Sequence, residues 1–171
     1  MIERTIYHVD LETTNVKGGS GVGRAVVVYD TKFGNTERLA NALAEGLRKQ
    51  GIEVDCVRVD AVAVGRLAGY DLLVVGGPTH AFGISKPMKD FIEKLKNVDL
   101  RGKKAFAFDT KLKSRLAGSA AKGIEKHLER LGMSIVKPHS SAIVKGAEGP
   151  LEEGVEEKFR QIGAEMANLL R

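Results

Sequence analysis

The sequence predicts a doubly wound α/β fold, in which helices cover both faces of a parallel β-sheet. Short apolar, β-branched runs alternate along the chain with segments whose apolar residues have helical spacing. Five strands that alternate with helices in this way form a parallel sheet through right-handed crossovers. A chain of 171 residues with 43% hydrophobic content suits one domain with a single sizeable core.

The strands are predicted from apolar runs bounded by glycine, proline or charged residues. The third run reads Leu-Leu-Val-Val, which is typical of a strand buried on both faces. Because proline removes a donor from the ladder, we expect the fifth strand to break at Pro138 and to resume after it. The predicted strands are residues 25–28, 52–59, 71–76, 103–108 and 133–144.

The helices are predicted from apolar residues three or four positions apart. In the first helix, Leu39, Leu43 and Leu47 share one face, and Gly51 follows as a stop. Pro87 suits the first turn of the third helix, where its missing N–H has no intrahelical partner to lose. The predicted helices are residues 37–50, 61–68, 87–95, 120–131 and 151–170.

A single domain is predicted over residues 24–171, after an N-terminal extension or arm over residues 1–23. Alternating residues 6–11 suit an extra edge strand or hairpin. The glycine-rich residues 18–24 precede the first strand instead of following it, so we interpret them as a linker and not as a nucleotide-binding loop.

Charge and composition argue against several classes of partner. The 27 basic and 22 acidic residues are intermixed and the aromatic content is 5%, so we expect no nucleic-acid partner. Apolar runs are short and the N-terminus has no signal pattern, so we expect a cytoplasmic protein without membrane contact. The single cysteine, Cys56, lies in an alternating run and is interpreted as a structural thiol.

The segment after the first strand predicts an anion site. Thr31, Gly34, Asn35 and Thr36 combine little bulk with hydroxyl and amide donors, and the following helix offers its N-terminus. A phosphorylated cofactor is the first hypothesis. The alternative is an ordinary strand-to-helix turn, because glycine and asparagine tolerate positive φ and threonine caps helices.

The pattern Thr-x-x-Gly-Asn-Thr after an apolar strand resembles the phosphate-binding loop of the flavodoxin family, where it holds the 5'-phosphate of FMN. The resemblance covers about residues 24–170 and implies a three-layer sandwich with strand order 2-1-3-4-5. In such a sheet the ligand crevice lies at the carboxyl ends of the first, third and fourth strands. The resemblance assigns phosphate binding to Thr31, Lys32, Phe33, Gly34, Asn35 and Thr36.

The segment after the third strand resembles the second flavin-binding loop of this family, which brings backbone to the isoalloxazine ring. Phe82 is predicted to stack on the ring or, alternatively, to fill the core. Gly83 offers a peptide that can turn over when the flavin is reduced, and His80 either shields the ring or is a solvated bystander. The resemblance assigns ring contacts to Pro78, Thr79, His80, Ala81, Phe82 and Gly83.

The segment after the fourth strand departs from the family pattern. Acidic residues and a tyrosine are usual there, whereas this chain has Lys111, Lys113 and Arg115 and no tyrosine. These cations either favour the anionic reduced flavin or form a solvated surface. The resemblance assigns further FMN contacts to Asp109, Thr110, Lys111, Gly118 and Ser119.

An FMN-binding carrier that passes electrons between redox protein partners is the function that the resemblance implies. An FMN-dependent NAD(P)H:quinone oxidoreductase is the alternative, and a flavodoxin fold without flavin is a further one. A phosphorylated receiver module is disfavoured, because Gly76-Gly77 stands where its acceptor aspartate would follow the third strand. No catalytic triad or metal-ligand spacing stands out, so the cofactor is expected to supply the chemistry.

Overall fold

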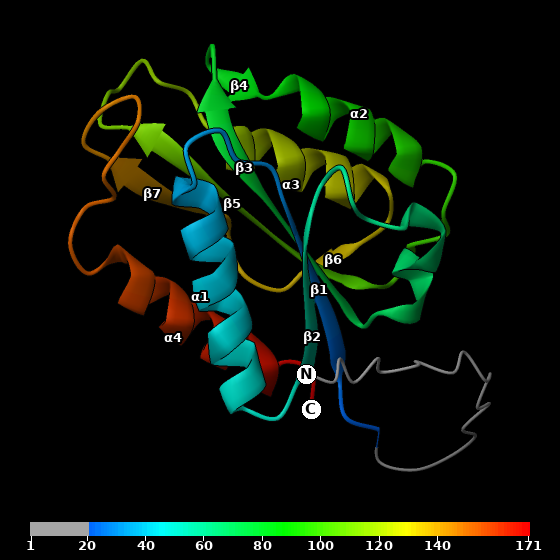
Figure 1. Cartoon of the computed structure of the whole chain (residues 1–171). Helices are drawn as coiled ribbons and strands as arrows, with labels where there is room; N and C mark the ends of the chain where they lie inside the picture. The colour runs from blue at the N-terminus through cyan, green and yellow to red at the C-terminus, as the bar shows by residue number, and fades with distance from the viewer. Residues whose placement is uncertain (1–20) are drawn as a thin grey trace, which may run out of the picture.

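A parallel sheet with strand order β2-β1-β3-β5-β6 forms the middle layer of the fold (Figure 1). The computed structural model describes residues 21–171, so the predicted arm lies largely outside the described residues. Both β6 and β7 pair with β5 in parallel, on either side of Pro138, which confirms the break predicted there. The parallel strands are β1 (Arg24–Tyr29), β2 (Glu53–Arg58), β3 (Leu72–His80), β5 (Lys104–Leu112), β6 (Ser134–Ile135) and β7 (Ser140–Val144).

Helices cover both faces of this sheet and bury a separate apolar core on each (Figure 1). Alternate residues of β1 point to opposite faces, so Val27 belongs to one core and Val28 to the other. The predicted doubly wound α/β fold is therefore confirmed, but the sheet divides the expected single core into two. On the first face lie α1 (Asn35–Lys49) and α4 (Val155–Asn168), and on the second lie the 3-10 helix η1 (Val64–Gly69), α2 (Lys86–Leu95) and α3 (Ala120–Arg130).

Two central strands run further than the sequence predicted. The prediction ended the third strand at Gly76 and the fourth at Phe108, but β3 reaches His80 and β5 reaches Leu112. The pairing of β3 with β5 continues to Pro78 and Thr110, and β5 pairs with β7 up to Leu112. Tertiary pairing thus outweighs the local turn signal of Gly-Gly-Pro.

The last helix starts later than predicted, at Val155 instead of Leu151. Leu151 forms a bridge with Val144, and Gly154 precedes the helix with φ of +80°. A residue held in that left-handed conformation cannot continue a helix, so the chain turns before α4 begins. The first helix, in contrast, begins two residues earlier than predicted, at Asn35.

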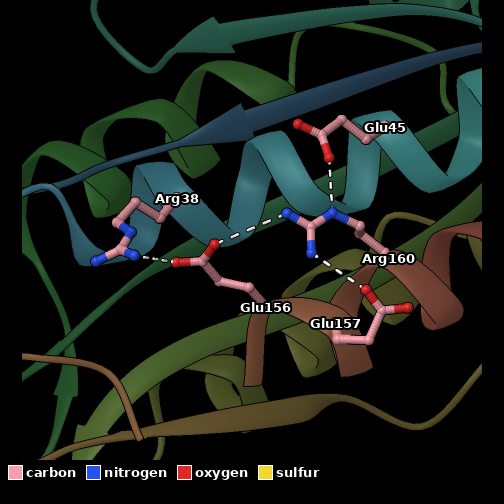
Figure 2. Close-up of polar contacts among 5 residues, drawn as sticks. All are labelled: Arg38, Glu45, Glu156, Glu157 and Arg160. Carbon is pink, nitrogen blue, oxygen red and sulfur yellow. Dashed lines mark hydrogen bonds and ion pairs between the residues drawn. The ribbon is translucent and has the colours of Figure 1, made fainter. Parts of the chain in front are cut away.

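The contact between α1 and α4 combines ion pairs of half-buried and exposed side chains with a close approach of the two backbones. Between the helices, Arg160 lies 2.7 Å from Glu45 and Arg38 lies 2.5 Å from Glu156, while within α4 Arg160 lies 3.2 Å from Glu157 (Figure 2). Ion pairs at the surface contribute little stability. The close approach depends on Gly46, because a Cβ there would lie 2.0 Å from the carbonyl oxygen of Arg160.

Cys56 of β2 is a half-buried thiol that donates a hydrogen bond to the side-chain oxygen of Asn41 at 3.6 Å. Burial raises its pKa to about 11, against the opposing effect of the nearby Arg48 guanidinium. Since only the thiolate reacts with disulfides, we expect slow labelling by DTNB at pH 8 in the folded protein. The labelling rate should rise with pH towards 11, and urea-unfolded protein should react at once. Equal rates at pH 8 in folded and unfolded protein would contradict the raised pKa.

Candidate functional site

Two adjoining cavities open where β1, β3 and β5 end. The first, of about 270 Å³, is lined mainly by the turn after β1 and by the ends of β3 and β5. The second, of about 520 Å³, lies between that turn, the end of β2 and the start of α2. Thr31, Lys32 and His80 line both cavities. The predicted crevice at the carboxyl ends of the strands therefore exists.

The turn after β1 has the features of a phosphate site. Gly34 has φ of +88° and precedes α1, and no side chain caps this helix end. Thr31 fixes the turn, because its hydroxyl oxygen accepts a hydrogen bond from the Gly34 amide at 3.0 Å. Uncapped N–H groups at a helix N-terminus bind anions readily. The start of α1, in the wall of the first cavity, therefore suits an anionic group.

Two threonine hydroxyls meet in the wall of the first cavity beside this turn. The side-chain oxygens of Thr36 and Thr110 lie 3.1 Å apart, and both residues are buried. Asn35 donates its side-chain amide to the carbonyl oxygen of Glu148 at 3.1 Å, which joins the turn to the segment after β7. The turn is thus tied to two other segments at the same edge of the sheet.

A tight hairpin follows β3, where His80 pairs with Gly83 of β4 (Gly83–Ile84). Its two turn residues, Ala81 and Phe82, have φ of 41° and 74°, as type I′ turns require. Non-glycine residues in this conformation carry backbone strain, which often marks functional sites. Phe82 is 72% exposed, so it does not fill the core. Gly83, where we predicted a peptide turnover, is not in the left-handed region.

Asp109 joins the second and third predicted loops from inside the protein. It is completely buried, and its Oδ2 accepts hydrogen bonds from Thr79 at 3.0 Å, Ser119 at 2.8 Å and the Ala121 amide at 2.9 Å. Ser119 in turn caps α3 by accepting from the Lys122 amide. These contacts hold the end of β3 and the start of α3 against β5. Asp109 therefore positions the site and does not line it.

The structure brings together most, but not all, of the predicted site residues. Leu112, Val144 and Ala147 line the first cavity although we did not predict them; the pairing of Leu112 with Val144 would have revealed two of them. Of the predicted residues, Ala81 and Gly83 line only the second cavity. Neither cavity is lined by Gly34, Phe82, Asp109, Gly118 or Ser119. The predicted residues that line the first cavity are Thr31, Lys32, Phe33, Asn35, Thr36, Pro78, Thr79, His80, Thr110 and Lys111.

In α/β sandwiches, phosphate-bearing ligands bind where the strand order reverses and a helix begins without a cap. Comparison with known proteins identifies the family of such proteins to which this chain belongs. The flavodoxin family model matches residues 27–162. A flavodoxin from Clostridium saccharobutylicum is 28% identical over 155 residues, which cover 85% of this chain and 96% of that protein. The crystal structure of oxidised flavodoxin 1 from Bacillus cereus has a TM-score of 0.78 at 25% identity and covers 87% of this chain and 100% of that one. An NAD(P)H dehydrogenase (quinone) from Cupriavidus metallidurans is 35% identical over 101 residues, but covers only 47% of this chain and 51% of that protein.

The chain belongs to the flavodoxin family. It is an FMN-binding, flavodoxin-like electron-transfer protein. Within residues 21–171, no helix combines the length and the apolar character needed to cross a bilayer.

Proposed function

We propose that the first cavity holds FMN and that the protein carries electrons between redox proteins of the cytoplasm. The observation that carries this proposal is the start of α1. Gly34 leaves that helix end uncapped at the mouth of a cavity whose wall holds the hydroxyls of Thr36 and Thr110. This arrangement suits a dianionic phosphoryl group at one end of a larger ligand.

Within this proposal, each part of the cavity has a separate task. The amides that begin α1 and the hydroxyls of Thr31 and Thr36 hold the phosphate, while Lys32 adds a positive charge. Pro78 and Thr79 offer backbone groups to the polar edge of the ring system, and Leu112 offers an apolar surface. FMN, when bound, supplies the electron-transfer chemistry. Asp109 keeps the strands that carry these groups in register.

Substitution of Thr36 by aspartate tests the phosphate site. Thr36 lines the first cavity at the start of α1, so a carboxylate there would repel the phosphate instead of donating a hydrogen bond to it. A hydrogen bond to a charged group contributes about 1.5–3 kcal/mol, and like-charge repulsion adds to its loss, so we expect FMN affinity to fall by about 100-fold or more. The measurement is a titration of apo-protein followed by quenching of flavin fluorescence.

Riboflavin, which lacks the phosphate, is the matched control ligand. Its affinity should change much less than that of FMN in the same variant. A Thr36→Val variant, which removes the hydroxyl without adding charge, should weaken FMN by about tenfold. Equal losses for FMN and riboflavin would show a general disturbance of the cavity, and unchanged FMN affinity would refute phosphate binding at this turn. Circular dichroism reports whether each variant is folded.

The second cavity favours one alternative function, an FMN-dependent NAD(P)H:quinone oxidoreductase. It adjoins the first cavity and is lined by Lys32, Arg58, Lys86 and Lys89, which suit the phosphates of a nicotinamide cofactor. The two functions differ in steady-state kinetics. A carrier reconstituted with FMN should oxidise NAD(P)H only very slowly with a quinone as acceptor, unless a separate reductase is added. Rapid turnover by the protein alone would establish the oxidoreductase instead.

A further inference from the structure

Large apolar side chains are exposed mainly around the first cavity. Among residues 21–171, six large hydrophobic residues are exposed, and four of them lie in the loops or at the end of β5 on this side of the sheet. These four form what we call the apolar centre: Phe33, Phe82, Leu112 and Leu116, which are 47%, 72%, 46% and 79% exposed. Such a concentration on one surface marks an interaction site more often than chance exposure does.

The four residues lie on segments that contact one another. Phe33 and Leu112 line the same cavity. The segment that carries Leu116 packs on the hairpin that carries Phe82, because a Cβ at Gly118 would lie 2.2 Å from the Phe82 carbonyl oxygen. The hairpin after β3 and the segment after β5 lie at the end of the sheet away from the C-terminus (Figure 1). The apolar centre is therefore one surface at the end of the sheet where the first cavity opens, with Phe33 and Leu112 in the cavity wall and Phe82 and Leu116 beyond it.

Basic residues surround this apolar centre. Five cations line the two cavities: Lys32, Arg58, Lys86, Lys89 and Lys111. The one carboxylate in these walls, Asp30, is buried and accepts a hydrogen bond from Ser85 at 2.6 Å.

Two more cations, Lys113 and Arg115, are exposed beside Leu116. Asp60 pairs with Arg58 and Asp90 with Lys86, but the other cations of this surface have no ion-pair partner within residues 21–171. The segment after β7 is acidic instead, because it carries Lys145 against Glu148, Glu152 and Glu153. Away from that segment the rim of the apolar centre is positive, and we call its unpaired cations, Lys32, Lys89, Lys111, Lys113 and Arg115, the basic rim.

We propose that the apolar centre and its basic rim form the docking surface for an acidic redox protein, a proposal that rests on the proposed carrier function. Protein interfaces combine an apolar centre with a polar rim. Charges of one sign on such a rim steer a partner of opposite sign and raise its association rate. Electrons leave or enter FMN where the first cavity opens, so this surface is the place where a redox partner must approach.

Other occupants fit this surface less well. A second copy of the chain would bring two basic rims together, and juxtaposed like charges oppose binding. An anionic lipid surface would satisfy the lysines and the apolar side chains, but it offers no redox group at the mouth of the cavity. The position of the surface around the cofactor cavity therefore favours an acidic protein that carries its own redox centre.

The test uses the FMN-loaded protein, reduced photochemically and mixed in a stopped-flow instrument with two haem proteins of opposite charge. Cytochrome b5 is the acidic acceptor and cytochrome c the basic one. We expect the second-order rate with cytochrome b5 to fall at least tenfold between about 20 and 500 mM salt, because salt screens attraction. The rate with cytochrome c should stay constant or rise. A rate with cytochrome b5 that does not fall with salt would overturn the proposal.

A matched pair of double variants locates the effect on the surface. Lys113→Gln with Arg115→Gln removes two charges of the basic rim, and we expect the low-salt rate with cytochrome b5 to fall about fivefold. Lys94→Gln with Arg130→Gln removes the same charges near the C-terminal ends of α2 and α3, and should leave that rate unchanged. Equal effects of the two pairs would show that net charge, and not this surface, sets the rate.

Direct binding separates docking from the carrier function. Isothermal titration with cytochrome b5 reports docking whether or not electrons are transferred, so binding without reduction would refute the carrier function and retain the docking surface. Leu116→Ser should weaken this binding, whereas Leu169→Ser, at the end of α4, should not. Tighter binding to phosphatidylserine vesicles than to cytochrome b5 would identify a membrane surface instead and overturn the proposal.

Discussion

Substitution of Asp109 by alanine is expected to lower the free energy of unfolding by about 4 kcal/mol and to weaken FMN binding. The carboxylate is completely buried and accepts three hydrogen bonds, two from hydroxyls and one from the backbone of α3. A typical internal hydrogen bond contributes about 1 kcal/mol and a buried donor left without an acceptor costs about 1–3 kcal/mol, although such contributions do not add fully. Alanine would also leave the three donors without an acceptor in the interior.

The loss of FMN affinity follows from the position of these donors. Thr79 lies in the wall of the first cavity, and Ser119 begins α3 directly after the segment that carries Leu116. Without the Asp109 carboxylate, both segments lose the common side-chain acceptor that holds them to β5, and only backbone pairing joins β3 to it. We therefore expect FMN and riboflavin to lose affinity alike, in contrast to the phosphate-specific loss in the Thr36 variant.

Urea unfolding, followed by far-UV circular dichroism, measures the change in stability. Asp60→Ala is the control, since it removes the same group from an exposed position and should alter stability by less than about 1 kcal/mol. Asp109→Asn should fall between wild type and Asp109→Ala, because the amide oxygen still accepts hydrogen bonds. An Asp109→Ala variant as stable as Asp60→Ala would show that the buried hydrogen bonds do not hold these segments.

The sequence was most informative where a local pattern is enough to determine structure. The strand-to-helix junction and the anion site are both predicted from one local pattern, a buried strand followed by the small polar turn that begins near Thr31. Pro138 marks the division of the last strand, because the missing N–H acts on the ladder locally. These features depend on neighbouring residues, so no knowledge of distant contacts is needed to predict them.

Local sequence patterns could not predict the features that depend on pairing between distant segments. The end of β5 is fixed by β7, so the exposure of Leu112 at the cavity follows from a register that periodicity does not reveal. The position of Asp109 also depends on distant segments, whereas we expected Asp109 to contact the cofactor. Its spacing in the sequence does not show that β3 and α3 supply donors to it from the interior. The sequence allowed Phe82 either to stack on the flavin ring or to fill the core. The hairpin turn that exposes Phe82 depends on pairing between β3 and β4.

Among the contacts between segments that are distant in the sequence, the crossing of α1 and α4 leaves the least space for an added side chain. We expect Gly46→Ala and Gly163→Ala each to lower the free energy of unfolding by about 3 kcal/mol, at the upper end of the usual cost of overpacking. A Cβ at Gly46 would lie 2.0 Å from the Arg160 carbonyl oxygen, and one at Gly163 would lie 2.3 Å from that of Leu43. At an open helical position the same substitution would stabilise the protein by up to about 1 kcal/mol. The close approach of the two helices therefore turns a stabilising substitution into a destabilising one.

Because both clashes are relieved by the same separation of the helices, the double variant should cost less than the sum of the two single variants. Urea unfolding of the three variants measures this coupling, with Gly65→Ala as control, since a Cβ there meets nothing within 4 Å. Separation would also move α1, whose first residues Asn35 and Thr36 line the first cavity, so FMN affinity should fall with stability. Strict additivity would mean that each glycine acts locally, and single variants as stable as wild type would show that the helices can separate at little cost.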